Sequence, residues 1–256
     1  FEGDGLTLDE EKMVLDNYAG RFGVDGFERI PIPTVDQIEL HGSRVEVPAK
    51  LAQICSTKDH DRLTHTYGKS FPDYVRIPDK DFTNAPDIVA YAKSEDDVDA
   101  VMDWATGANV AVIPFGGGST VVGGIEPAVG NSFAGSLSLD LTGLDQILEI
   151  DKVSRAARMQ GGIRCPDIEA GLRPHGLTMR HFPQSFDLAT LGGMIATRSG
   201  GHYATVYTHI DDFVESTRML TPAGAMESRR LPGSGAGPSP DRMAIRSEGS
   251  LGIITE

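Results

Sequence analysis

The residues best suited to binding a ligand are a run of glycines near the middle of the sequence. Three glycines at positions 116–118 are followed by Ser119 and Thr120, and a second glycine pair occupies positions 123–124. Glycine lets the backbone adopt positive φ and approach a ligand closely, and successive N–H groups turned inward form a concave anion site. Because hydrogen bonds to charged groups contribute about 1.5–3 kcal/mol each, a few such amides could hold a diphosphate. The alternative is a flexible surface loop, but the apolar run 110–114 directly before the glycines is typical of a buried strand.

Two later stretches also combine glycine with small polar residues. In residues 183–201, serine and threonine alternate with glycine, and their hydroxyl and backbone groups can line a flat heteroaromatic ring. Arg198 is the one arginine or lysine in that stretch, and a surface ion pair is the alternative role for it. Residues 247–254, Ser-Glu-Gly-Ser-Leu-Gly-Ile-Ile, on their own predict only a turn followed by a strand.

Two well-known nucleotide-binding motifs are only partly matched. The glycines at 116–118 do not open an amphipathic helix, as a Rossmann motif requires, because a β-rich stretch follows them. Residues 67–70, Tyr-Gly-Lys-Ser, are similar to the end of a Walker A loop. However, Leu63 replaces the earlier glycine of that loop, and Pro72 would obstruct the helix that should follow. The sequence therefore argues against a Rossmann site and an ATPase.

The composition argues against several other classes of protein. With 37 acidic and 23 basic residues, the formal charge of −14 would repel a nucleic-acid backbone. No apolar run reaches the roughly 20 residues of a membrane-spanning helix. The histidines and the two cysteines show no metal-ligand spacing, and no Gly-x-Ser-x-Gly elbow indicates a serine hydrolase. We expect a globular protein of a reducing, cytoplasm-like compartment, without a nucleic-acid partner, a transmembrane segment or a metal site.

A predicted strand–helix–strand unit leads into the glycine run. Residues 87–92 are a short apolar run, and Ser94 then begins the Ser-x-x-acid pattern of a helix N-cap. Gly107 can supply the left-handed cap that ends this helix. Further strands are expected at 135–141, 147–151 and 154–160, helices at 7–18 and from Pro166, unassigned elements at 190–197, 214–220 and 252–255, and a loop at 229–240.

In this order and at these separations, the glycine-rich stretches resemble the FAD-binding domain of the p-cresol methylhydroxylase and vanillyl-alcohol oxidase superfamily. Within it, the sequence is most similar to the alkylglycerone-phosphate synthase branch, also called alkyl-dihydroxyacetonephosphate synthase, over roughly residues 60–256. The supporting segments are 114–120, 190–193 with 197–200, 207–214, 221–224 and 247–256. Three departures stand out: Ser119-Thr120 where Thr-Ser is usual, Arg246 where glycine is usual, and Gly-Ala-Gly-Pro-Ser at 235–239 in place of the usual turn.

The resemblance implies FAD contacts in four segments of this sequence. The residues concerned are Pro114, Phe115, Gly116, Gly117, Gly118, Ser119, Thr120, Gln184, Ser185, Phe186, Asp187, Leu188, Ala189, Thr190, Thr197, Arg198, Ser199, Gly200, Glu248, Gly249, Ser250, Leu251, Gly252, Ile253 and Ile254. Relatives that attach the flavin covalently through the first segment carry a histidine there. Residues 114–120 of this sequence include no histidine. The implied FAD is therefore non-covalent. No catalytic residue can be assigned, because the resemblance places those residues in a C-terminal substrate domain.

Several functions stay open. The resemblance implies an FAD-dependent transferase that exchanges acyl for alkyl on acyl-dihydroxyacetone phosphate in ether-lipid synthesis. The alternatives are an FAD-dependent 2-hydroxyacid or alcohol dehydrogenase of the same superfamily, and a non-catalytic nucleotide-binding or scaffold protein. The expected partner is a small-molecule or lipid-like substrate, and a homodimer and a peripheral membrane contact are left open. The expected location is cytoplasmic, or peroxisomal in a eukaryote.

The expected fold is α+β, a two-subdomain FAD-binding domain of the p-cresol methylhydroxylase type that is truncated before the C-terminal substrate (cap) domain. Residues 1–80 are expected to form a helical or irregular arm on this domain, which occupies 81–256. Subdomain one, at about 84–140, is a βαβ unit, and subdomain two, at about 141–256, is a larger mixed sheet with helices. FAD is expected in the cleft between them.

Overall fold

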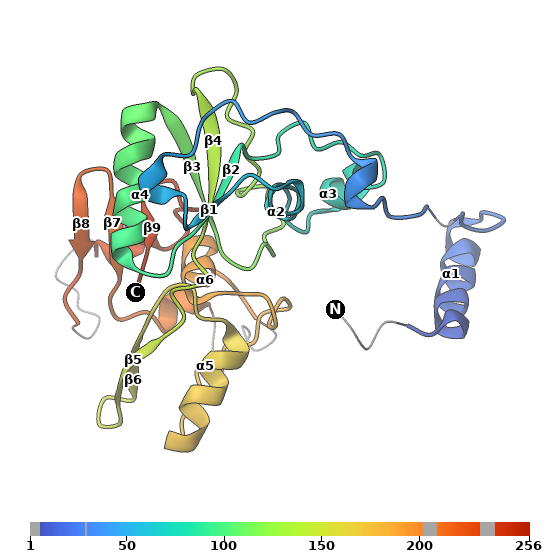
Figure 1. Cartoon of the computed structure of the whole chain (residues 1–256). Helices are drawn as coiled ribbons and strands as arrows, with labels where there is room; N and C mark the ends of the chain where they lie inside the picture. The colour runs from blue at the N-terminus through green and yellow to red at the C-terminus, as the bar shows by residue number, and fades with distance from the viewer. Residues whose placement is uncertain (1–5, 29, 202–208, 231–238) are drawn as a thin grey trace.

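A computed structural model describes residues 6–28, 30–201, 209–230 and 239–256 of the chain. The first part of the fold is a four-stranded sheet in the order β1-β2-β4-β3 (Figure 1). Its strands are β1 (Cys55–Ser56), β2 (Ile88–Tyr91), β3 (Val110–Phe115) and β4 (Gly135–Asp140). The last three run parallel, and β1 is added antiparallel to β2 at the edge. Strand β3 ends at Phe115, directly before the first glycine of the glycine run, Gly116.

Helix α4 (Glu95–Ala108) connects β2 to β3 and covers this sheet. Its Val98, Val101 and Ala105 are buried against the fully buried side chains of Ile88 and Leu137. The predicted N-cap at Ser94 is confirmed, because its hydroxyl accepts from the Asp97 N–H while the Asp97 carboxylate accepts from the Ser94 N–H. The predicted cap at Gly107 is wrong. The helix continues past it, and Asn109, which tolerates the left-handed region, takes φ 53°.

The second part of the fold differs from the single mixed sheet expected after residue 141. The two strands expected at 147–151 and 154–160 are present as β5 (Ile147–Asp151) and β6 (Ala156–Met159), and they pair antiparallel. A separate three-stranded sheet has the order β8-β7-β9, from β7 (Arg218–Thr221), β8 (Gly224–Glu227) and β9 (Ile253–Ile254). The helices are α5 (Cys165–Leu172), α6 (Leu191–Thr197) and α7 (Asp241–Ala244), with 3-10 turns at Arg173–His175 and Ile210–Asp212.

The two parts have separate hydrophobic cores that meet at β7 and β9. Met219 and Ile254 belong to the second core, whereas their neighbours Leu220 and Ile253 belong to the first. This division follows from the alternation of side chains along a strand. The two cores agree with the predicted two-subdomain α+β fold.

The first 80 residues contribute elements of their own: α1 (Leu8–Phe22), α2 (Asp59–Thr64), α3 (Phe71–Arg76), and 3-10 turns at Val35–Gln37 and Ala49–Leu51. Helix α1 is capped by Thr7, buries only Ala19 among its described residues, and lies apart from the sheets in Figure 1. In contrast, Leu51 and its neighbours pack into the first core, and β1 pairs with β2.

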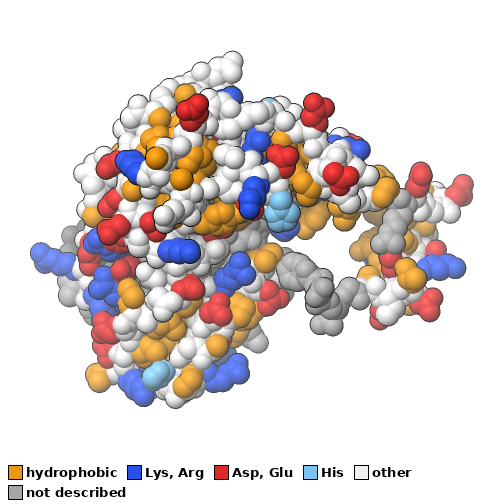
Figure 2. Space-filling view, viewed as in Figure 1, with side chains coloured by type: hydrophobic (Ala, Val, Ile, Leu, Met, Phe, Trp, Pro, Cys, Tyr) orange, Lys and Arg blue, Asp and Glu red, His pale blue; other side chains and the backbone are white. Residues whose placement is uncertain are grey.

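The described surface carries charges of both signs. On the face seen in Figure 2, lysine and arginine side chains lie scattered among acidic ones. None of the described helices has the length and apolar character needed to cross a membrane. The predicted loop at 229–240 and two sequence features named above, the segment 207–214 and the Gly-Ala-Gly-Pro-Ser turn, lie partly outside the described residues.

Candidate functional site

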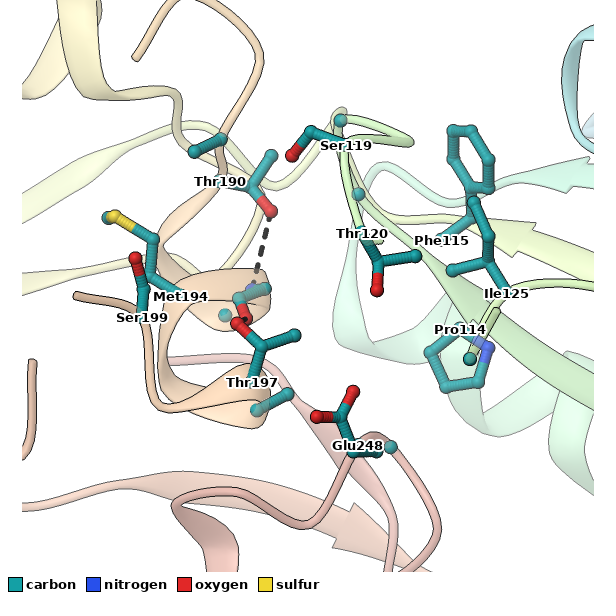
Figure 3. Close-up of a pocket in the computed structure, with 18 of the residues that line it drawn as sticks. Pro114, Phe115, Ser119, Thr120, Ile125, Thr190, Met194, Thr197, Ser199 and Glu248 are labelled. Carbon is teal, nitrogen blue, oxygen red and sulfur yellow. Dashed lines mark hydrogen bonds between the residues drawn. The ribbon is translucent and has the colours of Figure 1, made fainter. Parts of the chain in front are cut away.

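A cavity of about 340 Å³ lies where the end of β3 faces α6 and the segment leading into β9. Figure 3 shows Ser119 and Thr120 of the glycine-rich loop on one side of it, and Thr190 and Thr197 on the other. The structure thus brings together residues more than 130 positions apart in the sequence, from Pro114 to Ile254. The cavity has the size and the mixed apolar and polar lining typical of a small-molecule site.

Most of the predicted site residues line this cavity. These are Pro114, Phe115, Gly116, Gly117, Gly118, Ser119, Thr120, Ser185, Ala189, Thr190, Thr197, Arg198, Ser199, Gly200, Glu248, Gly249, Gly252 and Ile254. The others do not: Phe186 packs into the second core and Ile253 into the first, the Ser250 hydroxyl donates to the Ser247 carbonyl, and Gln184, Asp187, Leu188 and Leu251 lie outside the lining. They share segments with lining residues but do not line the cavity themselves.

The glycine-rich loop presents unused hydrogen-bond donors. None of the backbone N–H groups from Gly116 to Thr120 donates to an acceptor in the part of the chain that the structure describes. A backbone donor away from water needs a partner, so a cluster of such donors beside a cavity favours an acceptor supplied by a ligand. Several amides in one turn with a left-handed glycine, here Gly118 at φ 61°, form an anion-binding concavity. The loop can therefore hold a negatively charged group such as a diphosphate.

Helix α6 forms the opposite wall. The Thr190 hydroxyl caps its start by accepting from the Gly193 N–H, which is the dashed contact at Thr190 in Figure 3. The Gly192 N–H donates to the Gly161 carbonyl at 2.6 Å, so this end of the helix is joined to the protein itself. At its other end, the Thr197 hydroxyl donates to the Gly193 carbonyl, and Arg198 takes φ 52°. On this wall, the cavity is therefore lined by Thr190 at the start of α6, and by Thr197 and Arg198 at its C-terminal end.

Two charged residues line the described cavity. Arg198 points its guanidinium toward Asp211, with 3.4 Å between the Nη2 and Oδ2 atoms, which realises the ion pair considered as its alternative role. Glu248 takes φ 52°, and Figure 3 shows its carboxylate directed between Thr120 and Thr197. Desolvation raises the pKa of Glu248, and the nearby Arg246 partly opposes this. An anionic ligand therefore gains more from the loop amides than from fixed positive charge.

A buried histidine supports one lining residue from behind. His181 is 2% exposed, and its Nε2 lies 3.1 Å from the Ser199 hydroxyl. Burial lowers the pKa of His181, and the neighbouring His209 contributes in the same direction. This contact was not predicted, because the histidines were weighed only as metal ligands. Among the described residues, no group of three or more His, Cys, Asp or Glu side chains is placed to hold a metal ion.

Ten further residues line the cavity that were not among the predicted cofactor contacts, namely Val121, Val122, Gly124, Ile125, Leu141, Gly161, Gly192, Gly193, Met194 and Ala196. The glycines among them stand in or beside the stretches already singled out, so glycine clustering could have found them. Leu141 and Met194 carry no such signal, because only the fold brings these ordinary core residues to the cavity.

Comparisons with known proteins agree with this geometry. The chain is 40% identical over 195 residues to an alkyldihydroxyacetonephosphate synthase of Dictyostelium discoideum, covering 76% of this chain and 32% of that protein. An FAD-linked oxidoreductase of Escherichia coli strain K12 is 34% identical over 172 residues, covering 67% of this chain and 35% of that one. A solved structure of alkyldihydroxyacetonephosphate synthase matches with a TM-score of 0.79 at 33% identity, over 88% of this chain and 43% of that one.

The chain thus spans about a third of the length of these curated relatives. A family described as "FAD binding domain" matches residues 86–228, which include the glycine-rich loop, α6 and Arg198. The family match and the similar solved structure lead to one conclusion. The chain belongs to the family of FAD-binding domains.

Proposed function

We propose that this chain binds FAD non-covalently in the cavity, with the pyrophosphate on the loop of residues 116–120. The observation that carries this proposal is the set of N–H groups from Gly116 to Thr120, which lie beside the cavity and donate to no acceptor among the described residues. The hydroxyls of Thr190 and Thr197 supply polar contacts on the opposite wall. The proposed cofactor contacts are the lining residues predicted from the sequence.

The lining also supports a non-covalent cofactor. Covalent attachment of a flavin needs a nucleophilic side chain such as His, Cys or Tyr within reach of the ring system. None of the lining residues found in the described parts of the chain is of these types. When bound, FAD supplies a redox-active ring system, and the residues of this chain bind and orient it.

For the whole protein, we propose an activity like that of the alkyldihydroxyacetonephosphate synthases: exchange of acyl for alkyl on acyl-dihydroxyacetone phosphate, in ether-lipid synthesis. The synthase of Dictyostelium discoideum is the more similar of the two curated relatives described above, at 40% against 34% identity. The substrate-binding and catalytic residues are expected outside the FAD-binding domain. We further propose that the N-terminal arm ends at residue 80. A homodimer, a peripheral membrane contact and a cytoplasmic or peroxisomal location also stay expectations.

An FAD-dependent oxidoreductase is the second candidate. It is favoured by the 34% identity to the FAD-linked oxidoreductase of Escherichia coli over two thirds of this chain. Bleaching of the flavin spectrum by 2-hydroxyacids without oxygen would select this candidate. A spectrum unchanged by them, together with bleaching or turnover on acyl-dihydroxyacetone phosphate and a fatty alcohol, would select the synthase.

The first experiment is an absorbance spectrum of the purified protein before and after acid precipitation. We expect oxidised-flavin bands that move to the supernatant, because a non-covalent cofactor is released when the protein unfolds. Flavin in the pellet would contradict the non-covalent mode. A colourless protein that gains no flavin on incubation with FAD would contradict the proposed function.

A further inference from the structure

The glycine-rich loop has few hydrogen bonds of its own among the described residues. Its amides from Gly116 to Thr120 donate to no described acceptor, and the Val122 N–H reaches the Thr120 hydroxyl only at 3.4 Å. A loop with several unsatisfied donors beside a cavity needs support from outside itself to hold them in one arrangement. The structure supplies this support at three points, all from residues 61–84, which precede the family-matched segment 86–228.

The first support point is the end of the loop at Thr120. The Lys69 N–H donates to the Thr120 carbonyl at 2.8 Å. Gly68 lies so close that a Cβ built on it would be 2.2 Å from the same carbonyl oxygen and 3.0 Å from the Thr120 Cγ2. Only glycine permits this approach. Gly68 and Lys69, from the partial Walker A motif, thus hold the end of the glycine-rich loop.

The second support point is Glu126, just beyond the second glycine pair. The Arg76 Nη1 donates to both carboxylate oxygens of Glu126 at 2.9 Å, and the Asn84 amide donates to one of them at 2.8 Å. The Glu126 side chain is 15% exposed. The Glu126 N–H donates to the Gly123 carbonyl at 3.1 Å, which ties this ion pair to the second glycine pair, three residues beyond the end of the loop.

The third support point is Phe115, where β3 ends and the loop begins. The His65 ring lies 4.3 Å from the Phe115 ring, centroid to centroid. Its Nε2 is 3.0 Å from an Asp140 carboxylate oxygen, and its Nδ1 is 2.8 Å from the Asp61 carbonyl. His65 is 6% exposed, so the contact is part of the interior.

Part of the segment 61–84 is packed in the interior, although Phe71, Tyr74 and Val75 on α3 are exposed. Tyr67, Phe82 and Ala85 form a buried cluster on which Leu63 and Ile77 also pack. The Tyr67 hydroxyl donates to the Asp81 carbonyl, and the Arg76 guanidinium lies over the Tyr67 ring at 5.5 Å from its centroid. The segment can therefore transmit its own rigidity to the loop.

We propose that residues 61–84 are a positioning element for the cofactor, and that Arg76 and Gly68 set the direction of the loop amides. This inference rests on the proposed binding of FAD by the loop. It extends the functional unit upstream of the family-matched segment. A positioning residue of this kind lowers cofactor affinity when it is removed, although it touches no cofactor atom.

The test is a double-mutant cycle of Arg76→Ala, Glu126→Ala and the pair, read by titrating the flavin-free protein with FAD and by its thermal unfolding. We expect each single variant to raise the Kd for FAD by about five- to tenfold, and the double variant to raise it no further. The matched control is Arg230→Ala. Arg230 also pairs with carboxylates, those of Glu149 and Asp151, but it does not line the cavity. Its side chain is 38% exposed, close to the 37% of the Arg76 side chain.

Gly68→Ala is the second variant. Its Cβ would displace the Thr120 carbonyl, so we expect a larger rise in the Kd for FAD, of about tenfold or more. A wild-type Kd for FAD in all three single variants, Arg76→Ala, Glu126→Ala and Gly68→Ala, overturns the inference while leaving FAD binding intact. Equal losses of affinity in Arg76→Ala and Arg230→Ala also overturn it, because the effect would then be general. A wild-type protein that binds no FAD overturns the proposed function itself, and with it this inference.

Discussion

The carbonyl oxygen of Leu188 lies where a side chain at Gly117 would begin: a Cβ built on Gly117 would be 1.6 Å from it. The adjacent Gly116 is equally confined, since its Cβ would be 2.3 Å from the Thr190 hydroxyl. The loop is therefore seated directly on residues 188–190. Glycine is required here by contact within the protein, in addition to any close approach of a ligand.

This contact changes what Gly117→Val tests. The variant should lose FAD binding, and it should also lower the free energy of unfolding of the flavin-free protein by about 3 kcal/mol, because the valine displaces backbone rather than a flexible side chain. Thermal and urea unfolding without FAD measure this. The control is Gly124→Ala, whose Cβ would meet only the Glu248 carboxylate, at 3.4 Å. Unchanged stability in Gly117→Val would show that the loop does not rest on Leu188.

Asp87 fastens the N-terminal part of the chain to the first sheet. Its side chain is fully buried and accepts from the Arg44 backbone, the Arg44 guanidinium and the Ser136 N–H. Burial raises the pKa of Asp87, but these hydrogen bonds outweigh it and hold the pKa below the usual value. Hydrogen bonds to a charged group contribute about 1.5–3 kcal/mol, so we expect Asp87→Asn to lower the free energy of unfolding by about that much at pH 7.

The pH dependence of this loss has a definite sign. A lowered carboxyl pKa contributes stability that is complete above the unfolded pKa of about 4 and is lost as the pH falls through the folded pKa. The difference between wild type and Asp87→Asn should therefore shrink below about pH 4. Urea unfolding at several pH values checks this, with Asp59→Asn as the control because Asp59 is 60% exposed and lies 3.8 Å from Arg62. A constant difference down to pH 3 would contradict the assignment.

Arg218 joins the two parts of the fold. Its guanidinium donates to both carboxylate oxygens of Glu95, at the start of α4, and to Glu227 on β8. We expect Arg218→Ala to lower the free energy of unfolding by about 1.5–3 kcal/mol, the contribution of charged hydrogen bonds. The hydrogen bonds from Arg218 lower the pKa of Glu95, so this loss should also fade below about pH 4. Thermal unfolding compares it with Glu227→Ala, which removes only the 54%-exposed partner and should change little.

Local signals in the sequence predicted the elements well. The Ser94 capping box marked the start of α4, and the apolar run before the glycines marked β3. Such signals depend on residues a few positions apart, so they can be read from the sequence without knowledge of the fold. The end of α4 was misplaced because Asn109 can adopt the left-handed region almost as well as Gly107.

Contacts between distant residues could not be predicted in this way. Gly161 lies against the Ile254 carbonyl, and a Cβ on it would be 2.3 Å from that oxygen, yet the two residues are 93 positions apart. The support of Thr120 by Gly68 is of the same kind. Periodicity and capping carry no information about which loops meet. The resemblance to a known family identified the segments of the cavity, and the structure identified which of their residues face it.

Arg246 takes φ 67°, in the left-handed region that favours glycine. A residue with a Cβ costs about 1 kcal/mol or more in the left-handed region, whereas glycine adopts it freely. Arg246→Gly should therefore raise the free energy of unfolding by about 0.5–1 kcal/mol, and Arg246→Ala should not, because alanine keeps the Cβ while losing the same charge. Thermal unfolding of the flavin-free variants separates the two effects. Equal gains in both variants would assign the effect to the lost charge, and equal losses would show that the arginine side chain stabilises this turn.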